Sequence, residues 1–431
     1  MSGPGSQRAH ASEGAPKTPL PADIWVLVSA AFIVAIGYGI IAPILPQFAA
    51  SFDLGVTAAS IVVSSFALFR LLFAPAGGRL VDRLGERRVY VAGLLIVAAS
   101  TYAVAAAQTY WQLLLFRGLG GIGSTMFTVS AMALIIRLTP QEARGRASSA
   151  YASSFLFGSI LGPVVGGLLA GLGMRIPFVI YATGLLLAAA VVWFRLERQP
   201  QLDSGGPDAE AGEIAEAGET DPAQASAARS RVLPRMRFRD AWADSAYRAS
   251  LGSAVAVGWA AMGARIALYP LFVVAVLGAD ERVSGIALTV FAAGMAVSVA
   301  VVGRLSDSRG RRPFILVGLL VLGVATIAVG YSNSVWVFFG VTLLAGLGGG
   351  LVNPSVQAAV GDVIGRERSG GTVLSRFQMA LDVGAIAGPV VSGMLVDAFG
   401  YDWAFLVTGL VVLVAWVGWL RGRETLPRLQ G

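Results

Sequence analysis

Twelve apolar stretches constrain what this chain can fold into more than any other feature of its sequence. A helix needs about 20 mostly apolar residues to cross the hydrocarbon core of a bilayer. The stretches lie at roughly 24–46, 57–79, 89–108, 111–136, 147–170, 176–195, 247–277, 283–303, 313–331, 334–361, 371–396 and 402–420. Because 56% of the 431 residues are hydrophobic and only 13% are charged, the composition argues against a soluble protein. We predict an all-α polytopic membrane protein with twelve transmembrane helices in two six-helix halves.

The polar segments divide the chain into five parts. We predict a disordered cytoplasmic tail at 1–22, a first half at 23–198, a linker at 199–245, a second half at 246–421 and a cytoplasmic tail at 422–431. The linker stretch DSGGPDAEAGEIAEAGETDPAQASAA is acidic and lacks aromatic residues, so it cannot bury enough apolar surface to fold. The following RSRVLPRMRFRDAW alternates arginine with apolar residues, which is equally typical of a segment on the membrane surface and of a solvated linker.

Arginine is concentrated in alternate loops, which predicts the orientation in the membrane. Cytoplasmic loops of membrane proteins carry an excess of lysine and arginine. The arginine-rich loops contain Arg79, Arg83, Arg87, Arg88, Arg137, Arg144, Arg146, Arg304, Arg309, Arg311, Arg312, Arg366 and Arg368. We predict that these loops and both termini face the cytoplasm, and the abundance of glycine and alanine suggests a bacterial membrane. The net charge of +7 is then explained by loop arginines rather than by binding to nucleic acid.

Residue types that are missing exclude several kinds of chemistry. The chain has no cysteine, and its single histidine is His10 in the predicted tail. Disulfides, a serine–histidine hydrolase site and a clustered histidine metal site are therefore excluded. No phosphate-cradling Gly-Lys loop is present either. We predict no metal, no cofactor and no enzymatic activity.

The two halves are related in sequence. GRLVDRLGERR from Gly78 matches GRLSDSRGRR from Gly303, an offset of 225 residues. GSILGPVVGG from Gly158 matches GAIAGPVVSG from Gly384, an offset of 226 residues. Duplicated six-helix halves, with a binding site between them near the bilayer midplane, are typical of secondary transporters.

The same motifs resemble those of the major facilitator superfamily. GRLVDRLGERR resembles the superfamily's loop between helices 2 and 3, and RGLGGIG resembles the helix 4 motif built around a buried arginine, here Arg117. GSILGPVVGG resembles the helix 5 motif of antiporters, and GIIAPILP resembles the helix 1 pattern of drug:proton antiporters. The resemblance implies a member of the twelve-span drug:proton antiporter family. It also implies a monomer whose partners are protons, the lipid bilayer and a small-molecule substrate.

The resemblance further implies a cytoplasmic gate that holds the halves together when the transporter is open outward. The expected gate residues are Gly78, Asp82, Arg83, Gly85, Arg87, Arg88, Gly303, Asp307, Gly310, Arg311, Arg312 and Asp362. We expect Asp362 to join Asp307 and Arg311 in a charge network. Arg137 stands at the matching place in the first half, where the relay of some relatives has an acid, so a complete relay is not expected there. The alternative is a positive-inside anchor without a gating role.

Charged residues inside the spans cost about 2.5–3.5 kcal/mol at mid-helix on insertion scales, so they mark function. Asp382 is the only acid well inside a stretch, and we predict that it is the proton-coupling site, with a permanent salt bridge as the alternative. The resemblance implies that Arg117 takes part in proton transfer through a neighbouring acid, for which Asp382 is one candidate. We predict that Arg265 holds an anionic substrate group or pairs with Asp382. Arg70 is predicted to snorkel towards the cytoplasmic surface.

Two further groups of residues are assigned roles. We predict a substrate cavity lined by Tyr38, Trp259, Arg265, Asn353 and Gln378. We predict a hinge and seal, where the halves meet, from the residues Gly158, Gly162, Pro163, Gly166, Gly167, Gly384, Gly388 and Pro389. Glycines spaced by four form a smooth strip for a neighbouring helix, and proline bends the helix that contains it. On this interpretation Gly162→Leu folds but loses transport.

The function predicted from the sequence is secondary active transport, with a proton gradient as the energy source. The preferred form is proton-coupled efflux of small amphipathic molecules, such as drugs or antibiotics, by alternating access. The alternatives are a carrier of a sugar, carboxylate or other metabolite, with import as one of its two directions, and a membrane-embedded enzyme or sensor.

Overall fold

The computed structural model describes residues 20–140, 143–196, 236–365, 368 and 370–426, with only the backbone of 170, 301 and 303–309. Nearly all of the predicted tail 1–22 and most of the predicted linker 199–245 lie outside the described residues. Twelve helices in the described part are long and apolar enough to cross a membrane, which confirms the predicted fold.

The first half contains six spans and one short helix. They are α1 (Ala22–Ile41), α2 (Leu45–Ala50), α3 (Gly55–Leu84), α4 (Glu86–Ala106), α5 (Tyr110–Leu138), α6 (Arg144–Ala170) and α7 (Ile176–Arg195). The second half begins with the short helix α10 (Phe238–Ala243). Its seventh span is composite, because α11 (Ser245–Val257) and α12 (Arg265–Ala275) are joined by a π-helical segment at Gly258–Ala264. The remaining spans are α13 (Glu281–Arg309), α14 (Arg312–Gly330), α15 (Val335–Ile364), α16 (Gly371–Phe399) and α17 (Tyr401–Leu420).

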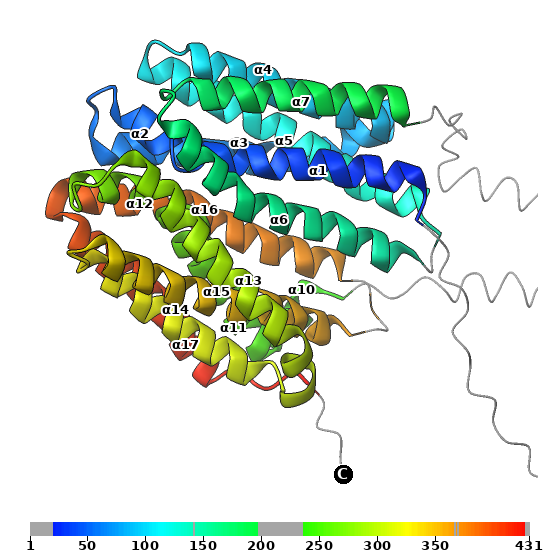
Figure 1. The fold of residues 1–431 in the computed structure, drawn as a ribbon. Coiled ribbons are helices and arrows are strands. Elements are labelled where there is room, and N and C mark those ends of the chain that lie inside the picture. Colours follow the sequence, from blue (N-terminus) through cyan, green and yellow to red (C-terminus); the bar gives the residue numbers. More distant parts are fainter. Residues whose placement is uncertain (1–19, 141–142, 197–235, 366–367, 369, 427–431) are drawn as a thin grey trace, which may run out of the picture.

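The two ends of the helix bundle differ in their content of arginine. At one end lie the α3–α4 and α13–α14 connections and the first and last described helix termini (Figure 1). We call it the arginine-rich end, because the connections and chain ends there carry Arg83, Arg87, Arg311, Arg312 and Arg423. The other, arginine-poor end contains α2 and the connections α12–α13 and α16–α17.

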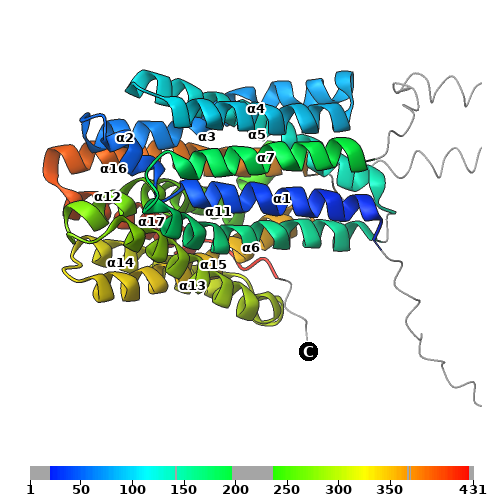
Figure 2. The same cartoon turned by 45° about the horizontal axis from the view of Figure 1, so that its top comes forward.

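Each half packs its own core, and two pairs of helices make most of the contact between the halves. α3 packs against α16, and α6 packs against α13, as Figures 1 and 2 show. Both contacts are close because small residues meet there. A Cβ at Gly393 would lie 2.7 Å from Ser60 Oγ, and a Cβ at Gly167 would lie 3.2 Å from the Cα of Gly285. The two contacts occupy matching places in the repeat, so the pseudo-symmetry extends to the surface between the halves.

Local sequence signals define where several helices begin. Thr109 and Ser334 accept hydrogen bonds from the backbone N–H groups of Gln112 and Trp336, and so cap α5 and α15. Asp280 caps α13 by accepting a bond from Arg282 N. Such side chains satisfy N–H groups that a helix leaves without an internal partner.

One motif glycine ends the second span of each half. Gly85 lies at φ 81° between α3 and α4, and Gly310 lies at φ 98° between α13 and α14. With ψ of 148° and 159°, both lie in a region that is open essentially to glycine alone. These glycines let one span turn into the next with almost no loop.

Gly78 and Gly85 belong to the same motif but should respond differently to alanine. At Gly85 alanine would carry a strained backbone, so we expect Gly85→Ala to destabilise the protein by about 1–3 kcal/mol. At Gly78, which is helical, a Cβ would meet nothing within 4 Å, so Gly78→Ala should not destabilise. Thermal unfolding of the purified variants in detergent measures the difference, and equal losses of stability would contradict it.

Candidate functional site

An ion pair between the halves lies near the middle of the molecule. Arg70 Nη2 of α3 donates to Asp382 Oδ1 of α16 at 2.9 Å, and Gln378 Nε2 donates to the same oxygen at 3.2 Å. The Asp382 side chain is only 12% exposed. The prediction that Arg70 snorkels to the surface is therefore wrong, since its guanidinium is directed to the other half. Within the described residues Asp382 pairs with neither Arg117 nor Arg265.

The other polar contacts between the halves lie nearer the arginine-poor end. Ser64 Oγ donates to the Ile386 carbonyl at 2.9 Å. Asp397 caps α3 from the other half, because its carboxylate accepts bonds from Val56 N at 3.0 Å, Thr57 N at 2.8 Å and Thr57 Oγ1 at 2.6 Å. Asp397 directly follows the predicted stretch 371–396 and was assigned no role from the sequence. Its three bonds make it a latch between the halves.

Gln47 adds a buried contact at the same end. Its Nε2 donates to the Pro270 carbonyl at 3.4 Å and to Ser284 Oγ at 3.3 Å, and the residue is 6% exposed. Gln47 is not among the residues predicted from the sequence, although it follows Pro46, which matches Pro270 in the other half and was a usable signal.

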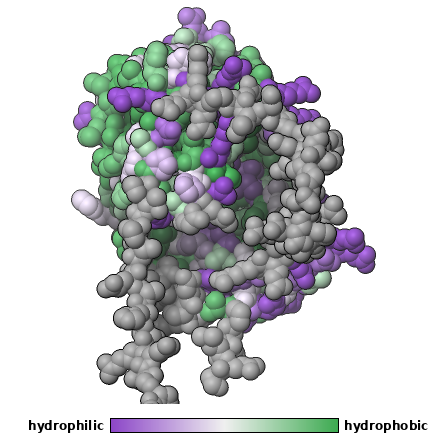
Figure 3. Space-filling view, turned by 90° about the vertical axis from the view of Figure 1, so that its right-hand side faces the viewer, coloured by the Kyte–Doolittle hydropathy of each residue, from purple (hydrophilic) through white to green (hydrophobic). Residues whose placement is uncertain are grey.

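The hydrogen bonds and ion pairs between described side chains of the two halves run from the arginine-poor end to Arg70–Asp382 and no further. From there to the arginine-rich end the halves diverge in Figure 1, and Figure 3 shows a recess between them on that face, bordered by hydrophilic residues. The described structure is therefore closed at the arginine-poor end and open at the arginine-rich end.

Among the described side chains, no hydrogen bond or ion pair joins the gate residues of the first half to the second half. Asp82 and Arg83 are exposed, and Asp82 has no hydrogen bond or ion pair within the described residues. Arg87 donates to the Trp193 carbonyl of α7 and lies over the Trp193 ring at 5.1 Å from its centroid. Arg88 is exposed. An open arrangement at this end leaves such a gate unlatched, so its gating role stays a prediction.

The expected charge network at the second loop is present in part. Arg311 Nε lies 3.4 Å from Asp362 Oδ2, whereas the side chain of Asp307 is not described. In the first half Arg137 Nη1 pairs with Glu86 Oε2 at 2.7 Å. Glu86 and Arg311 match at the offset of 225 residues, and so do Arg137 and Asp362. Both halves therefore contain the same ion pair with the charges exchanged, and the acid missing from the end of α5 is supplied by α4.

The segment after α17 binds to the second loop. The Glu424 carboxylate accepts bonds from the backbone N–H groups of Arg311 at 2.9 Å and Arg312 at 3.1 Å, at the start of α14. Arg423 Nη2 pairs with Asp244 Oδ2 at 2.5 Å, and Thr425 Oγ1 donates to Asp362 Oδ2 at 2.9 Å. We call residues 423–425 the tail clamp.

The glycines of the antiporter motif face into their own half. A Cβ at Gly162 would lie 2.5 Å from the Ile36 carbonyl oxygen and 2.6 Å from Gly39 Cα, both in α1. Gly158 and Gly166 likewise approach Ala35 and Ile40 of α1. In the second half Gly384 and Gly388 approach the backbone of the seventh span at Val255 and Trp259. In the first motif Gly167 and the Pro163 carbonyl approach Gly285 of the other half, whereas Gly158, Gly162 and Gly166 pack within their own half.

This packing argues against the expectation that Gly162→Leu folds normally. A leucine would collide with backbone atoms of α1, which cannot move aside as a flexible side chain could. We expect Gly162→Leu to yield little folded protein, and Gly162→Ala to lower the melting temperature by separating α1 from α6. The control is Gly145→Ala in the same helix, where a Cβ would meet nothing within 4 Å. Equal melting temperatures for the two alanine variants would contradict this.

Arg117 is the buried arginine of the helix 4 motif, and it contacts aromatic rings rather than an acid. The residue is 7% exposed, and its guanidinium carbon lies 4.3 Å from the Phe66 ring centroid and 5.8 Å from that of Tyr38. Its Nε is buried with no hydrogen-bond partner. Tyr38 is 39% exposed, so the predicted cavity residue borders open space.

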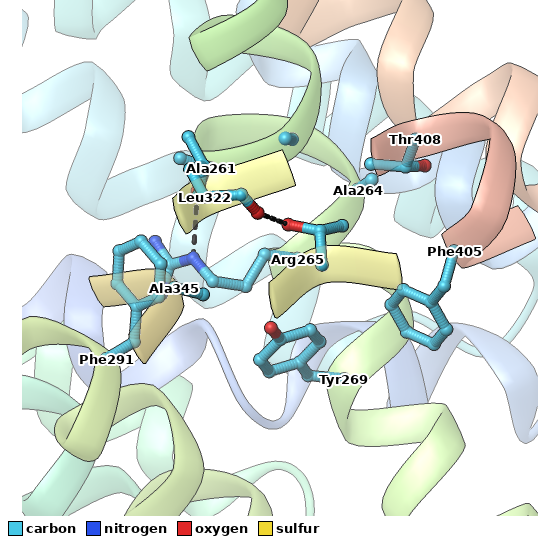
Figure 4. A pocket seen from close by; sticks show the side chains of 11 residues that line it. Ala261, Ala264, Arg265, Tyr269, Phe291, Leu322, Ala345, Phe405 and Thr408 are labelled. Carbon is cyan, nitrogen blue, oxygen red and sulfur yellow. Dashed lines mark hydrogen bonds between the residues drawn. The ribbon is translucent and has the colours of Figure 1, made fainter. Parts of the chain in front are cut away.

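Arg265 lies where the π-helical segment of the seventh span ends. Such segments often occur at functional sites, because the wider turn displaces side chains from regular positions. Arg265 Nε donates to the Ala261 carbonyl at 2.9 Å, and the guanidinium lies 3.9 Å from the Phe291 ring centroid. Figure 4 shows it beside Tyr269, Ala345 and a small cavity of about 10 Å³, close to the space that one water needs.

The remaining predicted cavity residues belong to the second half. Asn353 and Gln378 line a pocket of about 210 Å³ between α11, α13, α15 and α16, together with Met262, Met295 and Phe377. Trp259 does not line it, and its Nε1 is buried without a hydrogen-bond partner. The pocket combines apolar walls with three amides, those of Asn353, Gln357 and Gln378, and Gln378 links it to Asp382. No cluster of metal-ligating side chains is found among the described residues.

Two pseudo-symmetric six-helix halves, joined by polar contacts and opening at one end onto a recess, define a membrane transporter for small molecules. The sequence comparison specifies the family. The model of the Major Facilitator Superfamily matches residues 27–274 and 251–431, so the chain belongs to that superfamily.

Curated relatives cover nearly the whole chain at low identity. Multidrug resistance protein 1 of Bacillus subtilis (strain 168) is 25% identical over 397 residues, which is 91% of this chain and 95% of the relative. Quinolone resistance protein NorA of Staphylococcus aureus (strain MSSA476) is 23% identical over 381 residues, covering 87% of this chain and 90% of NorA.

Solved structures share the fold. A bacterial homolog of the human lysosomal transporter Spinster, inward-facing and unoccupied, aligns with a TM-score of 0.73 at 17% identity over 92% of this chain and 95% of that one. A POT family transporter in complex with 5-aminolevulinic acid aligns with a TM-score of 0.71 at 13% identity over the same shares.

The tail clamp should make stability depend on pH. Burial raises the pKa of the Glu424 carboxyl. The hydrogen bonds from the N–H groups of Arg311, Leu426, Arg312 and Thr425 together lower the pKa by more than burial raises it, so the net pKa is below its ordinary 4.5. A carboxyl with a lowered pKa stabilises the fold above its unfolded pKa, and this contribution is lost as the pH falls through the folded value.

We expect Glu424→Gln to lower the melting temperature by roughly 2 °C at pH 7. The difference from the unmodified protein should shrink below a pH of about 4.5. Melting curves from pH 3.5 to 8 measure it, with Asp402→Asn, an exposed carboxylate at the opposite end, as the control. A difference that stays constant with pH would contradict the clamp.

Proposed function

We propose that this transporter exports small amphipathic molecules in exchange for protons, and that Asp382 is the proton-coupling site. The observation that carries the proposal is the Arg70–Asp382 ion pair between the halves. The names of the relatives, for multidrug and quinolone resistance, and the antiporter motif in α6 support the direction of transport. The excess of arginine at the open end supports a cytoplasmic position for that end.

The ion pair gives proton binding a mechanical consequence. While Asp382 is ionised, Arg70 ties α3 to α16 and helps keep the arginine-poor end closed. Protonation removes the negative charge and weakens the bond, because a charged pair shielded from water is much stronger than a neutral contact. For exchange, Asp382 takes up a proton from outside while the arginine-poor end is open and releases it into the recess when the halves have rocked. The pair then forms again and, with the latch at Asp397 and the contact of Ser64, keeps the arginine-poor end closed until a substrate binds from the recess. The free energy of the proton gradient is thereby linked to the facing state.

Asp382→Asn tests the assignment because asparagine resembles the protonated acid in shape and charge. The assay uses inside-out vesicles with an acidic lumen. We expect gradient-driven accumulation of ethidium or another exported dye to fall at least about tenfold in the variant, because its coupling charge is gone. Exchange of labelled for unlabelled dye without a gradient should continue, because rocking of the halves does not require the ionised pair.

Asp402→Asn is the matched control, since Asp402 is an exposed acid at the arginine-poor end of the same half. Unchanged gradient-driven transport in Asp382→Asn would overturn the coupling assignment. Loss of both accumulation and exchange in a well-folded variant would show a structural salt bridge instead. Import into right-side-out vesicles would favour the metabolite carrier over the exporter.

A further inference from the structure

A pocket of about 210 Å³ lies wholly within the second half, between α11, the π-helical segment, α13, α15 and α16. No charged side chain is among the residues that line it. Met262, Met295 and Phe377 form part of its walls, and Gln357 and Gln378 are exposed, so a solute can enter. Because a dry cavity of about 150 Å³ holds benzene, this pocket has room for a flat molecule of about two rings.

The amides of this pocket have unused hydrogen-bonding groups. Asn353 and Gln357 make no side-chain hydrogen bond with any described residue, and Gln378 uses only its Nε2, in the bond to Asp382. Each amide has an oxygen that accepts and an NH₂ group that donates. A ligand that displaces water from such groups without replacing the hydrogen bonds binds poorly. The pocket therefore favours a neutral ligand with a polar group over a hydrocarbon and, because no lining residue is charged, over an ion.

Gln378 belongs both to the pocket and to the proton site. It lines the pocket, and its Nε2 lies 3.2 Å from Asp382 Oδ1, to which Arg70 Nη2 also donates at 2.9 Å. Neither Asp382 nor Arg70 lines the pocket. Among the described residues, Gln378 is thus the polar side chain through which a bound ligand and the proton site can act on each other.

The protonation state of Asp382 decides which atom of the Gln378 amide faces the acid. An ionised carboxylate only accepts hydrogen bonds, so Gln378 gives it an N–H and keeps the amide oxygen for the pocket. A protonated carboxyl has an O–H to donate, and a buried donor without an acceptor is costly. The Gln378 oxygen is the acceptor on the side chain already in contact, and half a rotation of the amide brings it to the acid. The pocket then meets an N–H in place of an oxygen.

Within the described residues, Arg70 is the one charged group bonded to Asp382. On α16 itself, Arg376 lies 3.8 Å from the centroid of an aromatic ring, and Asp397 caps α3. The π-helical segment has no titratable residue. The other elements packed against α16 hold their titratable side chains near helix ends or against aromatic rings. These are Arg79, Asp82, Arg83, Arg239, Asp240, Tyr247, Arg248, Arg265, Tyr269, Tyr401 and Asp402. A proton at Asp382 therefore acts first on Arg70 and Gln378.

We propose that the pocket binds small neutral aromatic molecules that donate a hydrogen bond, and that Gln378 couples this binding to the proton by rotating its amide. This rests on the proposed function and specifies its substrate class. A ligand that enters from the recess donates to the Gln378 oxygen while Asp382 is ionised. When Asp382 takes up a proton from outside, that oxygen turns to the acid and an N–H faces the donor of the ligand. The ligand loses its hydrogen bond and is released, as exchange for a proton requires.

The test compares three neutral ligands of similar size. Indole donates a hydrogen bond, benzofuran has nearly the same shape without the N–H, and 1-indanone has a carbonyl that only accepts. Binding to the purified full chain in lipid nanodiscs is measured by calorimetry at pH 8, with the heat from empty nanodiscs subtracted. We expect indole to bind about fivefold more tightly than either of the others, which corresponds to one hydrogen bond.

Asp382→Asn gives the pocket the form expected after protonation, because asparagine has an NH₂ group to donate where the ionised acid has none. In this variant we expect the order to reverse, with 1-indanone binding at least about threefold more tightly than indole. A pocket that does not sense position 382 would keep the order of the unmodified protein.

Two further variants locate the switch. Gln378→Met keeps the length of the side chain without its amide, so the order of the ligands should be the same with and without Asp382→Asn. Because Gln378 is exposed, its replacement should not prevent folding. Gln357→Met is the matched control, since it removes an amide of the same pocket that does not bond to Asp382. It should weaken binding and keep the reversal.

The proposal is overturned if indole and benzofuran bind equally to the unmodified protein, including no measurable binding of either. It is also overturned if the order survives Asp382→Asn, or if Gln378→Met leaves the reversal intact. The proposed function fails separately. If the reversal is found but transport does not respond to a proton gradient, the Gln378 switch stands and the coupled export falls. If Asp382→Asn abolishes gradient-driven accumulation but leaves the order of the ligands unchanged, the coupling stands and the switch falls.

Discussion

A charged pair that is withdrawn from water between two moving bodies is the interaction on which this structure depends. Arg70 and Asp382 belong to different halves and bond at 2.9 Å. Separating such charges in a shielded place is costly, and removing one partner of a fully buried pair costs about 3–5 kcal/mol. The Arg70 side chain is 38% exposed, so the cost here is lower. A bond of this strength can hold a conformation, and a single proton can still release it. A hydrophobic contact of equal strength would not respond to a proton.

The pair works only because the helices around it approach closely. Where Gly393 meets Ser60, and Gly167 meets Gly285, neither helix carries a side chain large enough to keep the other away. The backbones can then come near enough for Asp397 to reach the first N–H groups of α3. The glycines that form the antiporter motif have a related but different role, since most of them bring α6 against α1 within one half. Each half is thereby stiff, and the softer surface lies between the halves.

Much of the fold could be predicted from the sequence, because hydrophobic length alone selects membrane-crossing helices. The spans and the two-half organisation follow from apolar stretches and from repeated motifs. The π-helical segment at Gly258–Ala264 could not be predicted, because its GWAAMGA sequence is compatible with an ordinary helix and only packing selects the wider turn. The partner of Asp382 was missed for a similar reason. Arg70 lies near the middle of a long helix, and which face of α3 meets α16 depends on tertiary packing.

One part of the site was available from the sequence in a form that is easily overlooked. The first half has Arg137 where the second has Asp362, which read singly suggests that the ion pair is lost. At the start of the third span of each half a second exchange is found, because the first half has Glu86 where the second half has Arg311. When both partners of an ion pair change sign between the halves, the pair is kept with its charges reversed. The structure contains both pairs, Arg137–Glu86 at 2.7 Å and Arg311–Asp362 at 3.4 Å. An internal repeat thus supplies, within one chain, the paired substitutions that reveal contact. Arg70 had no such signal, because its counterpart in the second half is Met295 and the pair it forms is unique to the surface between the halves.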